Sequence, residues 1–237
     1  MSKENCLICG KPIRYFKEQK EMTCSICGNR FFSNAQCEDG HFICDSCHGQ
    51  KGIDAIRRTC LETKSKNPIA IIREIMRDPY IYMHGPEHHI MVGASLLTAY
   101  RNAGGNIQLE KCLDEMIKRG GQIPGGFCGL WGCCGAAVST GIFLSIAIEA
   151  TPLSGREWGL AQQGTAAALG EIASYGGPRC CKRDSFTSIL SAVKFVREHL
   201  GVEMEGGSRP IHCEFSAYNA ECLGKKCPFH KDREREV

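Results

Sequence analysis

The chain has 237 residues, enough for one large or two small domains, since a typical domain runs to roughly 100 to 200 residues. Apolar residues make up 43% and charged residues 23%, which excludes an intrinsically disordered or fibrous protein. The net charge of +3 is too small to predict a nucleic-acid partner. The outlier is cysteine, with 17 residues. Because no apolar export segment follows Met1, we expect a cytoplasmic protein whose cysteines bind metals rather than form disulfides.

Residues 1–66 carry metal ligands in pairs. Three pairs have the form C-x-x-C, which turns two sulfurs toward one point, and the glycine that follows Cys9 and Cys27 permits that turn. Eight ligands make two zinc sites, and two zinc ions would hold together a segment whose core is too small to fold alone. The predicted zinc ligands are Cys6, Cys9, Cys24, Cys27, Cys37, His41, Cys44 and Cys47.

These ligands can be grouped in two ways. A sequential grouping forms a zinc ribbon from the first two C-x-x-C pairs and leaves the other four ligands as a second site. A crossed grouping joins the second and third C-x-x-C pairs, the latter opening a helix from Asp45 to about Lys64, and leaves the first pair for Cys37 and His41. His48 is an alternative to His41. The order of the ligand pairs along the chain resembles that of treble-clef and RING-like modules and favours the crossed form. The further C-x-x-C pair of a RING domain is missing. We expect a structural role or the docking of a protein partner, and no ubiquitin-ligase role.

Residues 67–237 predict an all-α domain. Apolar residues such as Ile69, Ile72 and Ile75 follow the spacing of a one-sided helix. Asn67 can cap this helix and Pro68 suits its first position, which places the domain boundary near residue 66. The apolar run 136–148 is shorter than the about 20 residues of a membrane span and predicts a buried helix. The predicted helices are 68–77, 87–103, 108–119, 134–150, 155–174, 185–200 and 216–223.

Eight cysteines of this domain lie at helix starts or near the C-terminus, outside any C-x-x-C pair. Two groups of them precede predicted helices, where free N–H groups, the helix dipole and neighbouring cations favour a thiolate or an anionic cluster. The Cys227-Pro228 ending is also found among ferredoxin-type ligands. We therefore expect some of these thiols to hold an iron–sulfur cluster, such as [4Fe–4S], or another metal. A thiol–disulfide redox site and simple packing are the alternatives. The eight are Cys128, Cys133, Cys134, Cys180, Cys181, Cys213, Cys222 and Cys227.

Other side chains near these cysteines are candidates for catalysis. The segment from His84 to His89 brings three imidazoles and a carboxylate together, which suits metal binding or acid–base chemistry near neutral pH. Arg179, Lys182 and Arg183 flank two of the thiols and would hold a small anionic substrate. The candidate catalytic residues are Cys134, Cys181, Arg179 and His88.

Three segments, GGFCGLWGCCGAA, GGPRCCKR and CEFSAYNAECLGKKCP, carry a resemblance to a known family. They look like those of uncharacterised prokaryotic proteins, common in anaerobic bacteria and archaea, that contain a cysteine-rich domain of unknown function. The resemblance covers about residues 68–230. It implies an anaerobic setting, which suits oxygen-sensitive clusters, and it implies no particular activity.

The sequence as a whole predicts a mainly α protein, with a zinc-binding module at 1–66 and a cysteine-rich helical domain at 67–237. The function that we expect is iron–sulfur-dependent redox, sulfur-transfer or lyase chemistry on a small anionic substrate. One alternative is a zinc-finger adaptor or regulator whose helical domain senses redox state or a ligand. Another is a thiol–disulfide oxidoreductase that uses Cys133 with Cys134, or Cys180 with Cys181. The oligomeric state does not follow from the sequence.

Overall fold

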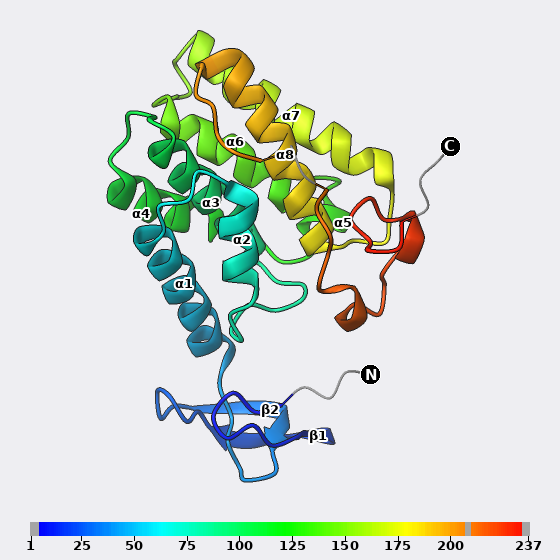
Figure 1. Cartoon of the computed structure of the whole chain (residues 1–237). Coiled ribbons are helices and arrows are strands. Elements are labelled where there is room, and N and C mark those ends of the chain that lie inside the picture. Colours follow the sequence, from blue (N-terminus) through cyan, green and yellow to red (C-terminus); the bar gives the residue numbers. More distant parts are fainter. Residues whose placement is uncertain (1–4, 207–209, 234–237) are drawn as a thin grey trace.

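A small two-stranded sheet and a larger helical body make up the structure, a computed structural model that describes residues 5–206 and 210–233. A long helix, α1 (Asp45–Glu62), connects the two parts (Figure 1). The expected fold class is confirmed, since a small N-terminal sheet with cysteine clusters precedes a mainly helical chain. In the described part of the chain, no helix combines the length and the apolar character that a membrane crossing requires.

The sheet is an antiparallel hairpin of β1 (Ile13–Thr23) and β2 (Arg30–Cys37). Its register is interrupted by an irregularity between Tyr15 and Lys20. Of the residues in the two strands, only Met22 and Cys37 are buried. The hairpin therefore has almost no apolar core of its own, which is the situation in which small modules depend on metal ions.

Helix α1 enters the helical body, where its residues Ile56 and Cys60 are fully buried. Helix α2 (Pro68–Met76) follows and begins as the sequence predicts. The Asn67 side chain accepts hydrogen bonds from the backbone N–H groups of Ile69, at 2.9 Å, and Ala70, at 3.2 Å. Pro68 occupies the first helical position, where its missing N–H leaves no hydrogen bond unmade.

Helix α3 (His88–Asn102) is the centre of the helical body. It is buried without interruption from Ile90 to Tyr100 and packs against α1, α2, α6, α8 and α4 (Leu109–Gly120). The apolar run 136–148 forms α6 (Gly135–Ala147), which packs between α3 and α7 and confirms the expected core helix. Helices α3 and α6 cross closely enough for the Gly93 backbone N–H to donate to the Ser139 hydroxyl at 2.9 Å.

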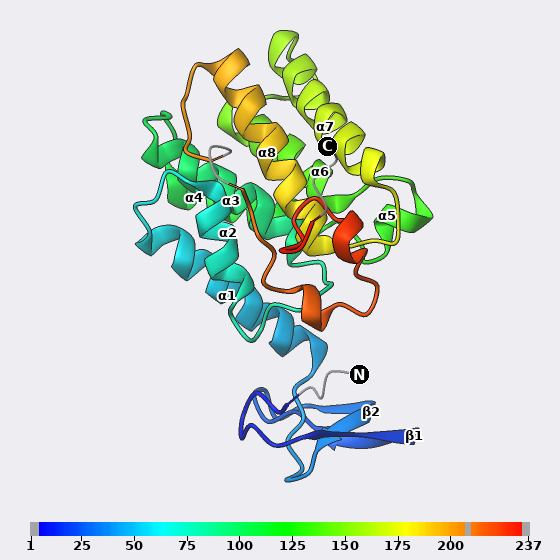
Figure 2. The ribbon, with the colours of Figure 1, turned by 45° about the vertical axis from the view of Figure 1, so that its right-hand side comes forward.

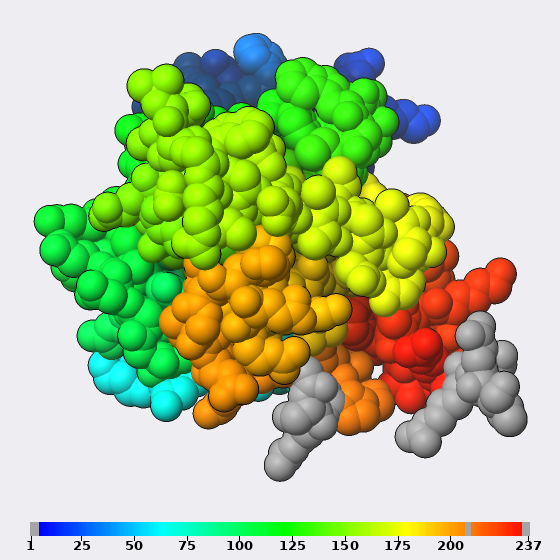
Figure 3. Space-filling view, turned by 90° about the horizontal axis from the view of Figure 1, so that it is seen from above, coloured from blue at the N-terminus to red at the C-terminus, as the bar shows by residue number. Residues whose placement is uncertain are grey.

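Helices α7 (Arg156–Tyr175) and α8 (Cys181–Leu200) pack side by side over α6 (Figure 3). Residues 201–206 and 210–233 return along α8 as an irregular segment with two short 3₁₀ turns, Ser216–Tyr218 and Gly224–Lys226 (Figure 2). The predicted helix 216–223 is therefore wrong. The start predicted for α8, residue 185, is also wrong, because Cys180 caps the helix and its sulfur accepts the Arg183 N–H at 3.5 Å.

Candidate metal centres

The first ligand group joins the loop before the hairpin to the end of β2. It consists of Cys6, Cys9, Cys37 and His41, whose ligand atoms all lie within 4.8 Å of one another. The Cys9 and Cys37 sulfurs are 3.6 Å apart, and the Cys37 sulfur lies 3.5 Å from His41 Nδ1. Four sulfurs placed about 2.3 Å from a zinc ion lie about 3.8 Å apart in a tetrahedron, so these distances suit a bound zinc.

The second ligand group joins the hairpin turn to the start of α1. Cys24, Cys27, Cys44 and Cys47 also meet within 4.8 Å, and the sulfurs of Cys27 and Cys44 are 4.0 Å apart. The two groups together reproduce the crossed grouping. His48 belongs to neither, because its ring stacks on Tyr82 with centroids 3.9 Å apart.

Backbone N–H groups prepare some of these thiols for a metal. Burial acts to raise the pKa of Cys24, but hydrogen bonds from the N–H groups of Cys44, Cys27 and Ile26 lower it to about 6. Burial is likewise outweighed at Cys37, where N–H groups of His41 and Asp39 contribute to a pKa of about 7. Both residues therefore carry substantial thiolate character near neutral pH, the form that zinc binds.

Four further thiols line a cavity between the start of α8 and the C-terminal segment. We call it the thiol cavity; it is small, with a volume of about 20 Å³. Its other walls include Met83, Phe186 and Phe229. Within residues 5–206 and 210–233, only the two N-terminal groups bring three or more ligand atoms within 4.8 Å, so the sulfurs here are spread more widely. The thiols of the cavity are Cys180, Cys213, Cys222 and Cys227.

Hydrogen-bond donors surround the sulfurs of the thiol cavity. The Asn219 side-chain amide donates to the Cys180 sulfur at 3.5 Å, and the Gly224 N–H donates to the Cys222 sulfur at 3.4 Å. His84 holds Asn219 in place, because its Nε2 donates to Asn219 Oδ1 at 3.1 Å. Thus His84 contacts the surroundings of this cavity.

The thiols at the helix starts are harder to ionise than the sequence predicts. Burial raises the pKa of Cys180 to about 11 and that of Cys134 to about 12, and the charge of Asp184 adds to both shifts. Burial also raises the pKa of Cys133 and Cys181. The expected lowering by the helix dipole and by cations is therefore wrong, because the loss of hydration outweighs both effects.

A second thiol group lies near the starts of α6 and α8. We use this name for Cys128, Cys134 and Cys181. Cys134 caps α6, and its sulfur lies 3.9 Å from Asp184 Oδ2 in the first turn of α8. Cys128 lies on the short helix α5 (Phe127–Leu130), close enough for its charge to contribute to the raised pKa of both other thiols. Neither Cys133 nor any member of the second thiol group lines the thiol cavity.

The candidate catalytic and anion-binding residues differ in their access to solvent. His88 and Lys182 are each 1% exposed, so a substrate would have to enter the helical body to reach them. Lys182 Nζ donates to the Tyr82 carbonyl at 3.1 Å and lies over the Phe215 ring. Arg183 donates to the carbonyls of Gly176 and Pro178, whereas Arg179 is exposed.

The helical body matches a family model described as a family of unknown function (DUF5714), over residues 56–230. The chain belongs to this family. The match includes the thiol cavity and the second thiol group, and it excludes the eight paired ligands of the N-terminal module. No curated protein and no solved structure matches the chain.

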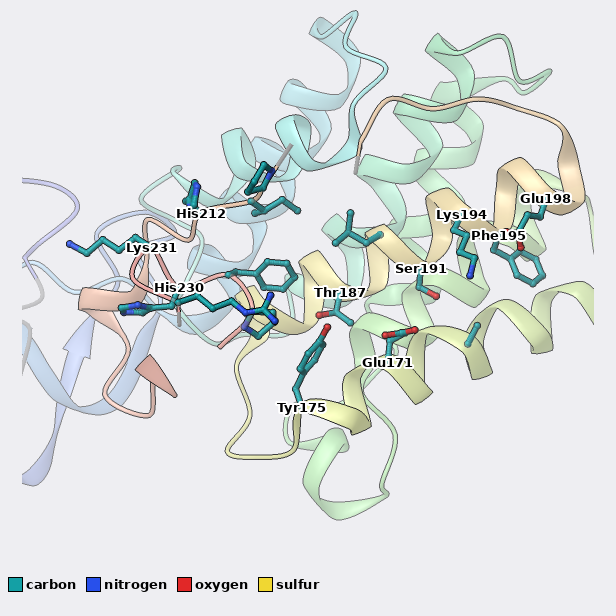
Figure 4. Close-up of a pocket in the computed structure, with 17 residues that line it drawn as sticks. Glu171, Tyr175, Thr187, Ser191, Lys194, Phe195, Glu198, His212, His230 and Lys231 are labelled. Carbon is teal, nitrogen blue, oxygen red and sulfur yellow. The ribbon is translucent and has the colours of Figure 1, made fainter. Parts of the chain in front are cut away.

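The family region also contains a groove of about 1150 Å³ between α7, α8 and the C-terminal segment (Figure 4). Phe229 and His230 line both this groove and the thiol cavity. Three basic side chains, His212, His230 and Lys231, lie at the end formed by the C-terminal segment, whereas Glu171 faces the middle (Figure 4). The groove therefore gives solvent a route to the wall of the thiol cavity.

Proposed function

We propose that this protein is an iron–sulfur electron-transfer protein with a zinc-stabilised N-terminal module. Cys180, Cys213, Cys222 and Cys227 would hold a [4Fe–4S] cluster, and the two N-terminal ligand groups would each hold one zinc ion. When bound, such a cluster exchanges single electrons at a potential set by its surroundings. The zinc ions would supply the folding free energy that the hairpin's small core does not.

The observation that carries this proposal is the convergence of four thiols on one cavity. Cys180 comes from the start of α8, and the others come from a segment more than thirty residues further along the chain. Sulfurs that hold one zinc ion lie about 3.8 Å apart, as they nearly do in the N-terminal groups. The wider spread around the cavity favours a larger, polynuclear group.

The polar groups near the cavity suit an anionic cluster. A [4Fe–4S] cluster with four cysteine thiolates is negatively charged, and N–H groups directed at its sulfurs help to set its potential. Arg183 lines the cavity, is 3% exposed, and has a buried Nη1 with no hydrogen-bond partner. Its Nε donates to Asp184 Oδ1 at 2.9 Å, so the guanidinium is already paired and would offer the cluster a hydrogen-bond donor, as Asn219 and Gly224 would, rather than a net positive charge.

Four protein thiolates favour electron transfer over lyase or sulfur-transfer chemistry at this cluster. With a cysteine on each iron, no iron is left open for a substrate. A small anionic reaction partner would approach through the groove, where His230 is shared with the cavity and His212 and Lys231 lie close by. An oxygen-free setting would protect such a cluster from oxidation.

The cluster is tested by purifying and reconstituting the full chain without oxygen. We expect bound iron and sulfide, visible charge-transfer absorption, and a paramagnetic signal on reduction. Cys227→Ser should lose this cluster's iron and absorption. Cys112→Ser should keep them, because Cys112 is a half-buried cysteine that belongs neither to the thiol cavity nor to the second thiol group. A protein that contains zinc alone under these conditions would contradict the proposal.

The zinc sites are tested separately by metal analysis. We expect two zinc ions per chain, with Cys9→Ser and Cys27→Ser each losing one of them. Cobalt substitution reports the ligands, since a site with four thiolates absorbs differently from one with three thiolates and an imidazole. His41→Cys should therefore make the two cobalt spectra alike. If both serine variants kept both zinc ions, the crossed ligand sets would be wrong.

A further inference from the structure

We propose that residues 222–233, here called the basic segment, are the docking surface for an acidic protein that carries single electrons. This docking surface rests on the proposed function, because the electrons must pass to the cluster in the thiol cavity. The reduced carrier would lose one electron and the cluster would gain it, so no bond forms or breaks. The carrier is the electron donor, whereas the small anion named above would be the acceptor.

The basic segment concentrates the positive charge of the chain. It contains three lysines, one arginine and a single acidic residue, Asp232, so its net charge of +3 equals that of all 237 residues. Lys226 and Lys231 are exposed, and within the described part of the chain neither forms an ion pair. Such a surface attracts an acidic partner and repels a basic one.

The acidic side chains that precede the basic segment face other basic groups. Glu214 pairs with Arg77 at 2.9 Å and with Arg73 at 3.3 Å. Glu221 lies 3.5 Å from Nε2 of His84. These carboxylates therefore have partners of their own on the helical body and leave the lysines of the basic segment available to a second protein.

Hydrogen-bonded turns hold the basic segment in a fixed shape. The His230 N–H donates to the Cys227 carbonyl at 3.1 Å, and the Arg233 N–H donates to the His230 carbonyl at 3.1 Å. The Cys213 N–H donates to the Phe229 carbonyl at 2.7 Å and ties the segment to the chain that precedes it. A surface that is already ordered loses little conformational entropy when a partner docks.

The basic segment also forms part of the wall of the thiol cavity. Cys222 and Cys227, two of the four proposed cluster ligands, belong to it, and Lys226 directly precedes Cys227. Phe229 and His230 line the cavity and the groove alike. A carrier bound over this segment would therefore be separated from the cluster by residues that touch both, which gives the electron a short path.

The groove beside the basic segment is larger and more open than a small anion needs. Its volume is about 1150 Å³, and its walls include the exposed residues Glu171 and Lys194 (Figure 4). Sites that enclose small molecules measure about 300 to 1,000 Å³ and bury most of the ligand. Electron-transfer complexes instead use small contacts, below about 1,200 Å² in total, and rely on complementary charge.

The test follows electron transfer from reduced flavodoxin, an acidic one-electron carrier, to the anaerobically reconstituted full chain. The flavodoxin is chosen with a potential below that measured for the cluster, and stopped-flow absorption gives the second-order rate constant. We expect this constant to fall about tenfold between about 0.02 and 0.3 M salt, because salt screens the attraction. At low salt, Lys226→Glu combined with Lys231→Glu should also lower it about tenfold.

Two controls isolate the docking surface. Lys111→Glu makes the same charge change at an exposed position of α4, which lies across the helical body from the basic segment (Figure 1), and it should react as wild type does. Dithionite, a small anionic reductant, reports the reactivity of the cluster without a protein contact. The rate constant of Lys226→Glu with dithionite should stay within about twofold of that of wild type, with unchanged iron content and circular dichroism.

Iron analysis separates the failure of the docking surface from the failure of the proposed function. A chain that holds the cluster but reacts with flavodoxin independently of salt and of both lysines would overturn the docking surface and leave the proposed function intact. Equal losses of rate with dithionite and flavodoxin would also overturn it, because the basic segment would then attract any anion. A chain without iron would overturn the proposed function, and the docking surface with it.

Discussion

His88 shows how burial decides the chemistry of a single side chain. Its Nδ1 donates to the Gly85 carbonyl at 3.1 Å, and its Nε2 is buried with no hydrogen-bond partner. Burial lowers the pKa of His88 well below its usual value, and the nearby Lys182 charge adds to the shift. His88 is therefore a neutral imidazole in the folded protein at physiological pH.

This neutral imidazole predicts a loss of stability on acidification. Below about pH 6.5 the unfolded chain gains a proton at His88 that the folded chain does not take up, so stability falls by up to about 1.4 kcal/mol per pH unit. His88→Asn retains a donor for Gly85 but cannot titrate. Its free energy of unfolding, from urea titrations between about pH 7 and pH 5, should fall less than that of wild type.

The control for this prediction is His199→Asn, at an exposed position near the end of α8. Because the His199 side chain is exposed, this variant removes a histidine without removing a buried imidazole. Equal losses of stability in wild type and His88→Asn would show that His88 does not remain neutral in the fold.

At the scale of elements, regular helices were predictable and irregular contacts were not. The apolar spacing in α2 and the Asn67-Pro68 cap are local signals, and both appear in the structure. The hairpin gives no such signal, because its strands bury only Met22 and Cys37. The α8 start was missed because Asp184, a favoured capping residue type, lies inside the first turn and binds Arg183 instead.

The candidate metal sites show the same difference between local signals, which the sequence reveals, and long-range contacts, which it does not. Spacing alone predicts the N-terminal ligands, since each pair is formed by neighbouring residues. The thiol cavity instead depends on an irregular C-terminal segment that returns to α8, so sequence spacing could nominate its cysteines but could not separate them from the second thiol group. The raised thiol pKa values were missed for a related reason: burial depends on tertiary packing, whereas helix-start effects are visible in the sequence.

Two glycine substitutions should have opposite effects on stability, one at Gly93 in the α3–α6 crossing and one at Gly170 on the exposed face of α7. A Cβ at Gly93 would overlap the Met116 sulfur and lie 3.0 Å from the Ser139 carbonyl oxygen, whereas a Cβ at Gly170 of α7 meets nothing within 4 Å. Gly93→Ala should lower the unfolding free energy by about 1 to 2 kcal/mol, because overpacking exceeds the gain in helix propensity. Gly170→Ala should raise it by about 0.5 to 1 kcal/mol.

Chemical denaturation of the two variants measures these changes. If Gly93→Ala were as stable as Gly170→Ala, the two helices would not be packed as closely as the structure shows.

At the scale of the whole molecule, α1 belongs to both parts of the chain. It starts at the second metal-ligand group and ends with Ile56 and Cys60 in the helical core. The family match also begins at residue 56, inside this helix. A boundary near residue 66 remains a prediction from the sequence, and α1 gives a way to test it.

Two truncations test whether the domain boundary lies before α1 or after it. Removing residues 1–44 deletes the hairpin and keeps α1, so the remaining chain should unfold cooperatively near the wild-type temperature. Removing residues 1–66 also strips Ile56 and Cys60 from the core, which should cost at least about 2 kcal/mol more. Thermal unfolding followed by circular dichroism compares them. Equal stabilities would place the boundary at residue 66.

The stacked rings of His48 and Tyr82 connect the second metal-ligand group to the start of α8. His48 follows Cys47 directly, and the carbonyl of Tyr82 accepts from Lys182, which follows Cys181. A zinc ion that fixes the first turn of α1 would thereby restrict the motion of the residues that anchor α8. For the zinc sites and the iron–sulfur cluster proposed above, loss of zinc would then lower the affinity for the cluster at a distance, and loading of one would favour loading of the other, a thermodynamic coupling without any shared ligand.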